Sequence, residues 1–216
     1  MKKGLDISQT LKIPQKKSKF FNDAEQVPSR DKKYSMTIVW DIDETLLNLK
    51  CKGNESGHFD GAPELRTGIV DVLIDLKKPD VEYIIWTAGG ELHAHRCVSS
   101  IQEVEFDYII HKKHNSDPGY RAKELSLLKR DMSSILIIDD NPKTAEFNED
   151  NVILIPSFSP LTKGQCLKTT EDLHEILRKS MEYKRNCGGV LSKYCRMHDK
   201  SCVVWFRGKL YTSIPE

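Results

Sequence analysis

Several features that mark common classes of protein are missing from this sequence of 216 residues. No apolar run approaches the ~18 residues of a membrane-spanning helix, and no apolar segment of a signal peptide is present at the N-terminus. The net charge is only +1, so nothing global indicates a membrane surface or nucleic acid as partner. Internal repeats are also absent. We therefore expect a soluble intracellular protein, of the nucleus or the cytoplasm, with no membrane partner.

The excess of positive over negative charge is small overall, but the charges are unevenly distributed along the chain. Residues 1–33 contain nine Lys and Arg against four Asp and Glu, which predicts a flexible basic arm. Either a targeting signal or a solvated tail would explain its lysines. The remaining chain is long enough for one full domain. We predict this domain over residues 34–185, followed by a small C-terminal appendage over residues 186–216.

No G-x-G-x-x-G follows the first apolar run, which argues against dinucleotide chemistry. The chain instead alternates between short apolar runs and helical patterns. The runs at 36–40, 81–86, 106–110, 134–138 and 152–155 predict buried strands, and the segments 64–77, 91–101 and 121–130, with others after Pro142 and from Thr169, predict helices. This alternation predicts an α/β fold of three layers, in which a central parallel sheet has helices on both faces.

Polar groups gather where these strands end. They are Asp41, Asp43 and Thr45 after the first strand, Thr87 after the second, Lys123 near the start of a predicted helix, and Asp139 and Asp140 after the fourth strand. Ligands of open α/β sheets bind beyond the carboxyl ends of the strands. Adjacent carboxylates repel each other unless a cation lies between them, and hard oxygen ligands suit a divalent metal. A plain polar turn is the alternative for each motif taken alone.

Together, these motifs resemble the haloacid dehalogenase (HAD) superfamily of aspartate-nucleophile phosphatases. The run Asp41-Ile-Asp-Glu-Thr-Leu46 is similar to the D-L-D-E-T-L of its FCP/SCP branch, whose members are RNA polymerase II C-terminal domain phosphatase-like and NLI-interacting-factor-like. The likeness continues at Trp86–Ala88, Lys123–Leu128 and Ile137–Pro142, and covers about residues 34–182. It implies a HAD-like Rossmannoid sandwich. No large cap domain fits between the motifs, which favours an open site and a bulky substrate.

The resemblance also implies roles for the matching residues. Asp41 would be the nucleophile that becomes an aspartyl phosphate, and Asp43 would be the general acid and then the base. The phosphoryl group would be bound by Thr45, Thr87, Ala88 and Lys123. Mg²⁺ would be held by the Asp41 carboxylate, the Asp43 backbone carbonyl and Asp140, with Asp139 supporting its water shell.

Two stretches depart from the branch. Its usual Asp-Asn-Ser-Pro is replaced by Asp139-Asp140-Asn141-Pro142, whose extra carboxylate should still bind Mg²⁺. The polar loop 48–63, a candidate flap over the site, is shorter than usual. His93 and His95, spaced i and i+2, point to different sides of a helix and do not predict a metal pair.

The function predicted is that of a Mg²⁺-dependent phosphoric monoester hydrolase acting on phosphoserine or phosphothreonine in proteins. One alternative is a phosphatase for nucleic-acid ends or small phosphate esters, suggested by the basic arm and the basic run 111–113. Another is a non-catalytic interaction module on the same fold, against which the retained acids argue.

The C-terminal appendage has a metal-ligand pattern of its own. Three thiols and one imidazole lie within 16 residues, at Cys187, Cys195, His198 and Cys202. They could form a closed structural Zn²⁺ site for a tail with little core. Free cysteines in a packed tail are the alternative, and residues 203–213 read as a small hairpin.

Overall fold

The structure is a computed structural model that describes residues 19–20, 30–49, 63–112, 122–148, 151–159, 170–179, 181, 203–206 and 209–211. Its strands are β1 (Lys19–Phe20), β2 (Met36–Trp40), β3 (Leu47–Leu49), β4 (Pro63–Leu65), β5 (Val81–Trp86), β6 (Tyr108–Ile110), β7 (Ile135–Asp139), β8 (Val152–Leu154), β9 (Val203–Phe206) and β10 (Lys209–Tyr211). Its helices are α1 (Ile69–Leu76), α2 (Glu91–Val98), α4 (Lys143–Phe147), the 3₁₀ turns η3 (Leu125–Leu128) and η4 (Met132–Ser134), and residues 170–179.

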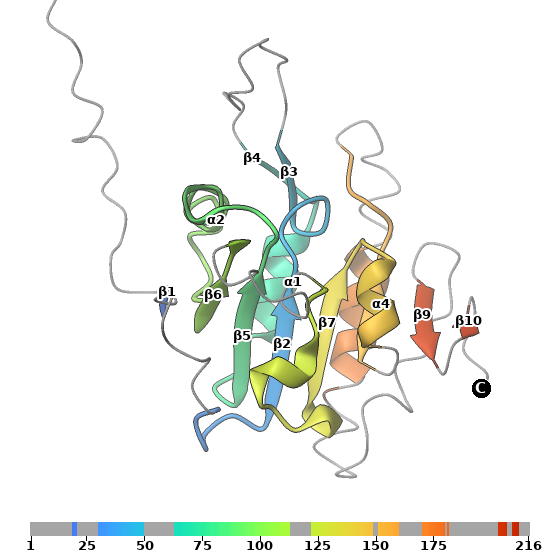
Figure 1. Cartoon of the computed structure of the whole chain (residues 1–216). Coiled ribbons are helices and arrows are strands. Elements are labelled where there is room, and N and C mark those ends of the chain that lie inside the picture. Colours follow the sequence, from blue (N-terminus) through green and yellow to red (C-terminus); the bar gives the residue numbers. More distant parts are fainter. Residues whose placement is uncertain are drawn as a thin grey trace, which may run out of the picture.

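One large sheet organises the molecule, in the order β1-β6-β5-β2-β7-β8-β9-β10 (Figure 1). All pairs from β1 to β8 are parallel, and β2 lies in the middle between β5 and β7. The central parallel sheet predicted from the alternating pattern is therefore confirmed. Parallel strands point the same way, so the residues after β2, β5 and β7 meet at one edge.

Apolar side chains cover both faces of this sheet, as the mainly apolar runs predict. Alternate strand residues such as Ile38, Trp40 and Ile138 pack with the buried sides of α1, α2 and helix 170–179. The intervening residues, such as Val39 and Ile137, pack on the other face with η3 and α4. These two cores give the three layers (Figure 1).

Two predicted helices differ from the structure. Instead of a helix over 121–130, only the 3₁₀ turn η3 forms, because Lys123 has a left-handed backbone (φ 54°) and Glu124 is extended. Instead of a helix from residue 64, β4 pairs with β3 as an antiparallel ribbon, and α1 begins after Gly68 at φ 78°. The ribbon is formed by the two ends of the predicted flap.

The terminal regions both contribute strands to the sheet. β1, from the predicted basic arm, pairs with β6, and β9, from the predicted appendage, pairs antiparallel with β8 and β10. The domain boundaries stay predictions. The candidate zinc ligands Cys187, Cys195, His198 and Cys202 lie outside the described residues. Among the described helices, none is long and apolar enough to cross a membrane.

Candidate active site

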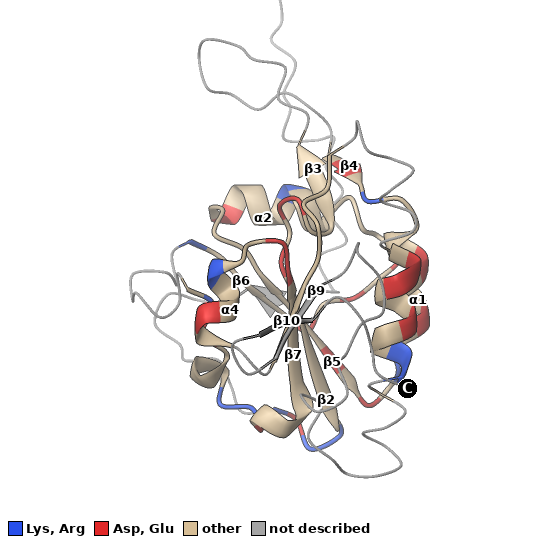
Figure 2. Cartoon of the chain, turned by 90° about the vertical axis from the view of Figure 1, so that its right-hand side faces the viewer, with Lys and Arg blue, Asp and Glu red and all other residues tan. Residues whose placement is uncertain are grey.

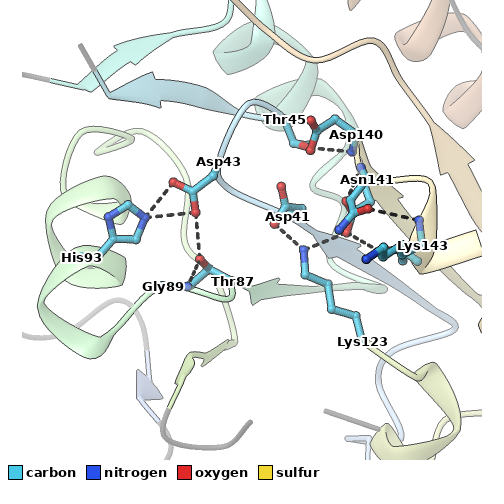
Figure 3. Close-up of polar contacts among 12 residues, drawn as sticks. Asp41, Asp43, Thr45, Thr87, Gly89, His93, Lys123, Asp140, Asn141 and Lys143 are labelled. Atoms are coloured by element: carbon cyan, nitrogen blue, oxygen red, sulfur yellow. Dashed lines mark hydrogen bonds and ion pairs between the residues drawn. The ribbon is translucent and has the colours of Figure 1, made fainter. Parts of the chain in front are cut away.

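Backbone hydrogen bonds between neighbouring strands continue for one residue beyond the ends of β2 and β5. The Asp41 amide donates to the Ile138 carbonyl of β7 at 3.0 Å, and the Thr87 amide donates to the Ile110 carbonyl of β6 at the same distance. After Asp41 the chain turns sharply, because the Ile42 carbonyl accepts from the amides of residues 45, 46 and 47. This geometry brings together the predicted Asp41, Asp43, Thr45, Thr87, Lys123 and Asp140 (Figure 3), and Asp139 joins them through its contact with Lys123. Figure 2 shows acidic segments of the chain in the loops at the end of the sheet nearest β3 and β4.

A buried ammonium group links two of the carboxylates. Lys123 Nζ donates to Asp41 Oδ1 and, at 2.7 Å, to Asp139 Oδ2. All three side chains are at most 9% exposed. Burial alone would lower the pKa of Lys123, but the charges of Asp41 and Asp139 outweigh this effect and raise the pKa. Lys123 therefore remains a cation.

One ammonium cannot fully compensate two buried carboxylates. Burial raises the pKa of Asp41 from 3.8 to about 7; the charge of Lys123 opposes the rise and the charge of Asp139 adds to it. Burial likewise raises the pKa of Asp140. The cluster therefore favours a further positive charge close to Asp41 and Asp140.

Asp41, Asp139 and Asp140 form a group that fits a divalent cation. One oxygen from each lies within 4.8 Å of the other two. Both Asp139 oxygens already have partners, since Oδ1 accepts from the Asn141 amide and Oδ2 from Lys123 and Thr144. This arrangement suits Asp139 to the water-shell role expected of it better than to direct ligation.

Thr45 and Ser157 fix the Asp140 side of the group. The Asp140 amide donates to Thr45 Oγ1 at 3.1 Å, and the Ser157 hydroxyl donates to Asp140 Oδ2. Thr45 is fully buried, so in this structure its hydroxyl joins the β2 turn to the end of β7. Ala88 is exposed directly after Thr87. A phosphoryl-binding role for Thr45 and Ala88 stays a prediction.

Asp43 has a partner that the sequence did not reveal. His93 Nε2 lies 2.8 Å from Asp43 Oδ1 and 3.1 Å from Oδ2, and the Thr87 hydroxyl donates to Oδ2 at 3.1 Å (Figure 3). Burial would raise the pKa of Asp43, but the hydrogen bond and charge of His93 lower it overall. The hydrogen bond to Asp43 raises the pKa of His93 from 6.5 to about 10.

Gly89 is the feature of the sequence that relates to the position of His93. A Cβ added at Gly89 would lie 2.2 Å from His93 Cδ2, so only glycine allows the imidazole to reach Asp43 over this turn. The spacing argument applied to His93 and His95 tested them only against each other. It could not reveal a contact with a residue 50 positions away.

A pocket of about 440 Å³ opens beside this pair. It is lined by Asp43, Glu44, Asn48, Leu49, Gly89, Gly90 and His93. Asp43 thus lies between the cluster around Asp41 and an open space of the protein surface.

We expect His93→Gln to lower thermal stability in a pH-dependent way. Because the pKa of His93 is raised from 6.5 to about 10, the pair stabilises fully below pH 6.5 and loses this contribution as the pH rises through about 10. The pKa of Asp43 is lowered from 3.8, so its share is lost only as the pH falls below that value. Melting curves without metal should show a larger deficit near pH ~6 than near pH ~10.5.

The matched control for this prediction is His95→Gln on the same helix. Burial lowers the pKa of His95, so its replacement should not produce a deficit that fades towards high pH. Equal deficits for His93→Gln at both pH values would contradict an ion pair with Asp43.

The family model that describes NLI interacting factor-like phosphatases matches residues 36–186, well over half of the 216 residues. The chain belongs to this family. The matched range contains every residue of the candidate site, and the resemblance seen in the motifs is confirmed.

Two curated relatives show how far the similarity extends. A probable C-terminal domain small phosphatase of Dictyostelium discoideum is 27% identical over 136 residues, which are 56% of this chain and 44% of that protein. CTD nuclear envelope phosphatase 1 of Xenopus laevis is 24% identical, over 68% of this chain and 73% of that protein. This family member thus spans less than half the length of the Dictyostelium relative.

A solved structure supports the fold. The fission yeast RNA polymerase II CTD phosphatase Fcp1, bound to beryllium fluoride, superposes with a TM-score of 0.50 at 13% identity and covers 74% of this chain and 69% of that chain. The likeness bears on architecture alone. It agrees with the HAD-like sheet predicted from the motifs, and no large cap is evident among the described residues.

Proposed function

We propose that the protein is a Mg²⁺-dependent phosphatase that uses Asp41 as nucleophile. The observation that carries this proposal is the position of the Asp41 carboxylate. It is buried at the carboxyl end of the central strand, beside the Lys123 ammonium and within reach of the acids that fit a cation. The family to which the chain belongs consists of phosphatase-like proteins by its description.

In the first step, an Asp41 oxygen would attack the phosphorus of a phosphate monoester, and the bond to the ester oxygen would break. Because the pKa of Asp43 is lowered and that of His93 is raised, the proton of this pair lies on His93 before the reaction, and it would pass through Asp43 to the departing oxygen. Lys123 and Thr87 would hold the phosphoryl oxygens. In the second step, Asp43 would take a proton from water as the water oxygen attacks the aspartyl phosphate, releasing inorganic phosphate and restoring Asp41.

Asp41 and Asp140, with the Asp43 backbone carbonyl, would hold Mg²⁺ beside the reacting phosphate, and Asp139 would orient its water. Bound there, the ion would neutralise charge on the phosphoryl oxygens. Charge balance supports this assignment. Four carboxylates face two cationic groups, Lys123 and His93, which leaves an excess equal to the charge of one Mg²⁺.

Mg²⁺ should therefore stabilise the folded protein. At millimolar Mg²⁺ and neutral pH we expect the melting temperature to rise by about 2–6 °C, and a chelator to reverse the rise. Asp140→Ala, which leaves no ligand oxygen at this position, should lose most of this shift, while Asp75→Ala, at an exposed acid on α1, should keep it. A full Mg²⁺ shift in Asp140→Ala would exclude Asp140 as a ligand.

For the substrate, we propose phosphoserine or phosphothreonine in a protein. The open pocket beside Asp43 offers space for a bulky leaving group, and several relatives are named as phosphatases of a C-terminal domain. Phosphatase action on nucleic-acid ends, the alternative, relied partly on the basic run 111–113. His111 is 1% exposed and so does not contribute to a basic surface.

Initial rates on matched substrates test this choice. Phosphoserine and phosphothreonine peptides should be turned over with higher kcat/KM than 3′- or 5′-phosphorylated oligonucleotides or sugar phosphates at equal Mg²⁺. A preference for oligonucleotide ends would favour the alternative.

Separately, metal analysis of the full chain and of Cys195→Ser tests the proposed Zn²⁺ site of the appendage.

A further inference from the structure

Lys123 has a backbone conformation that is unfavourable for its residue type. Its φ is 54°, in the left-handed region where a Cβ crowds the following carbonyl. Such a conformation persists only where the surroundings hold it, and it is common at functional sites. The contacts that hold Lys123 therefore bear on how its ammonium is aimed.

The side chain of Asn148 provides these contacts. Its Nδ2 donates to the Lys123 carbonyl at 2.9 Å, and its Oδ1 accepts from the Leu125 amide at 2.9 Å. The amide group thus spans Glu124 and binds the chain on both sides of it. Asn148 is 2% exposed, so water does not readily replace it.

The same amide connects Lys123 to the end of β7. Asn148 Nδ2 also donates to the Thr144 carbonyl of α4 at 2.8 Å, and the Thr144 hydroxyl donates to Asp139 Oδ2 at 3.0 Å. Asp139 Oδ2 in turn accepts from Lys123 Nζ at 2.7 Å. These contacts close a ring in which both the backbone and the ammonium of Lys123 are tied to one short helix.

We propose that Asn148 is a positioning residue for phosphoryl transfer: it holds the Lys123 backbone in the one conformation from which the ammonium reaches both Asp41 and Asp139. This inference rests on the proposed function, since it assigns a purpose to Lys123. Asn148 acts only through Lys123 and touches none of the reacting atoms.

The chain contains a matched control in Asn151. It is 5% exposed, and its Nδ2 also donates to two backbone carbonyls, those of Met132 at 2.6 Å and Ile135 at 2.7 Å. These contacts lie at the start of β7, the end opposite to the site. Replacing Asn151 therefore removes the same kind of buried amide without touching the ring around Lys123.

The experiment compares Asn148→Ala, Asn148→Asp and Asn151→Ala in the full chain. Hydrolysis of an aryl phosphate with Mg²⁺ is followed well below each melting temperature. We expect both Asn148 variants to lose between about tenfold and 100-fold in kcat, with KM changed less than about threefold, because the ammonium is misplaced rather than removed. Asn151→Ala should lose comparable thermal stability but keep kcat within about twofold.

Beryllium fluoride with Mg²⁺, a mimic of phosphate on an aspartate, provides a readout without turnover. It should raise the melting temperature of wild type and Asn151→Ala more than that of Asn148→Ala. Equal kcat in Asn148→Ala and Asn151→Ala would overturn the positioning role alone. So would wild-type kcat in Asn148→Asp, which cannot donate to the Lys123 carbonyl. Wild-type protein that neither releases phosphate nor responds to the mimic would overturn the proposed function, and this role with it.

Discussion

Asp41→Asn is expected to reduce phosphate release from an aryl phosphate to less than about a hundredth of the wild-type rate. The amide oxygen of asparagine is a poor nucleophile and cannot form the covalent phosphoryl intermediate. The change preserves shape and weakens the contact with Lys123, but it also removes a carboxylate whose pKa is raised by burial and by repulsion from Asp139, and the second effect offsets the first. We therefore expect the variant to melt no lower than wild type at neutral pH without Mg²⁺.

The control variant is Asp107→Asn. Asp107 is half-buried and accepts a hydrogen bond from the amide of Tyr83, near the amino end of β5. The variant should lose stability, through its contact with Lys77, but not turnover at a temperature where it stays folded. If Asp41→Asn retained more than about a hundredth of the wild-type rate, Asp41 would not be the nucleophile.

Arg130→Met is expected to destabilise the protein by about 3–5 kcal/mol. Arg130 and Glu82 form an ion pair whose side chains are both 0% exposed. Arg130 Nε and Nη2 donate to the two Glu82 oxygens at 2.9 and 2.7 Å, and the Thr37 hydroxyl donates to Oε2 at 2.6 Å. Removal of the arginine leaves a buried carboxylate without its cation, in the middle layer of the fold.

Chemical unfolding at neutral pH measures this loss. The control is Lys179→Met, whose partner Glu175 lies one helical turn away and whose pair is 57% and 58% exposed. That change should cost less than about 0.5 kcal/mol. Should Arg130→Met fail to fold, the milder Glu82→Gln keeps the test possible. Losses for the Arg130–Glu82 pair as small as those for Lys179 would contradict its role in stability.

The strands were predictable because each central strand is a mainly apolar run, in which Thr37 of β2 and Glu82 of β5 are the polar exceptions before the strand end. β2, β5 and β7 lie within one residue of their predicted positions, and polar residues at their ends mark where each strand stops. Parallel pairing alone then brings Asp41, Thr87 and Asp139 to one edge. The greater part of the candidate site follows from this topology and requires no knowledge of loop structure.

The remaining features depend on contacts between distant parts of the chain. A helix over 121–130 was a reasonable prediction from local propensity, but Asn148 takes the Leu125 amide and holds Lys123 outside helical geometry. His93 was assigned no role, because its partner Asp43 lies on another element. In both cases the deciding contact is made by a side chain that is distant in the sequence, and a periodic pattern of residues does not predict such a contact.

Direct detection of the covalent intermediate tests the central claim. The full chain with Mg²⁺ and an aryl phosphate is quenched during turnover, reduced with borohydride and digested, and the peptides are analysed by mass spectrometry. Reduction converts an aspartyl phosphate into homoserine. We predict homoserine at position 41, only when both substrate and Mg²⁺ are present. Turnover without modification at Asp41, or with modification at a different residue, would contradict the mechanism.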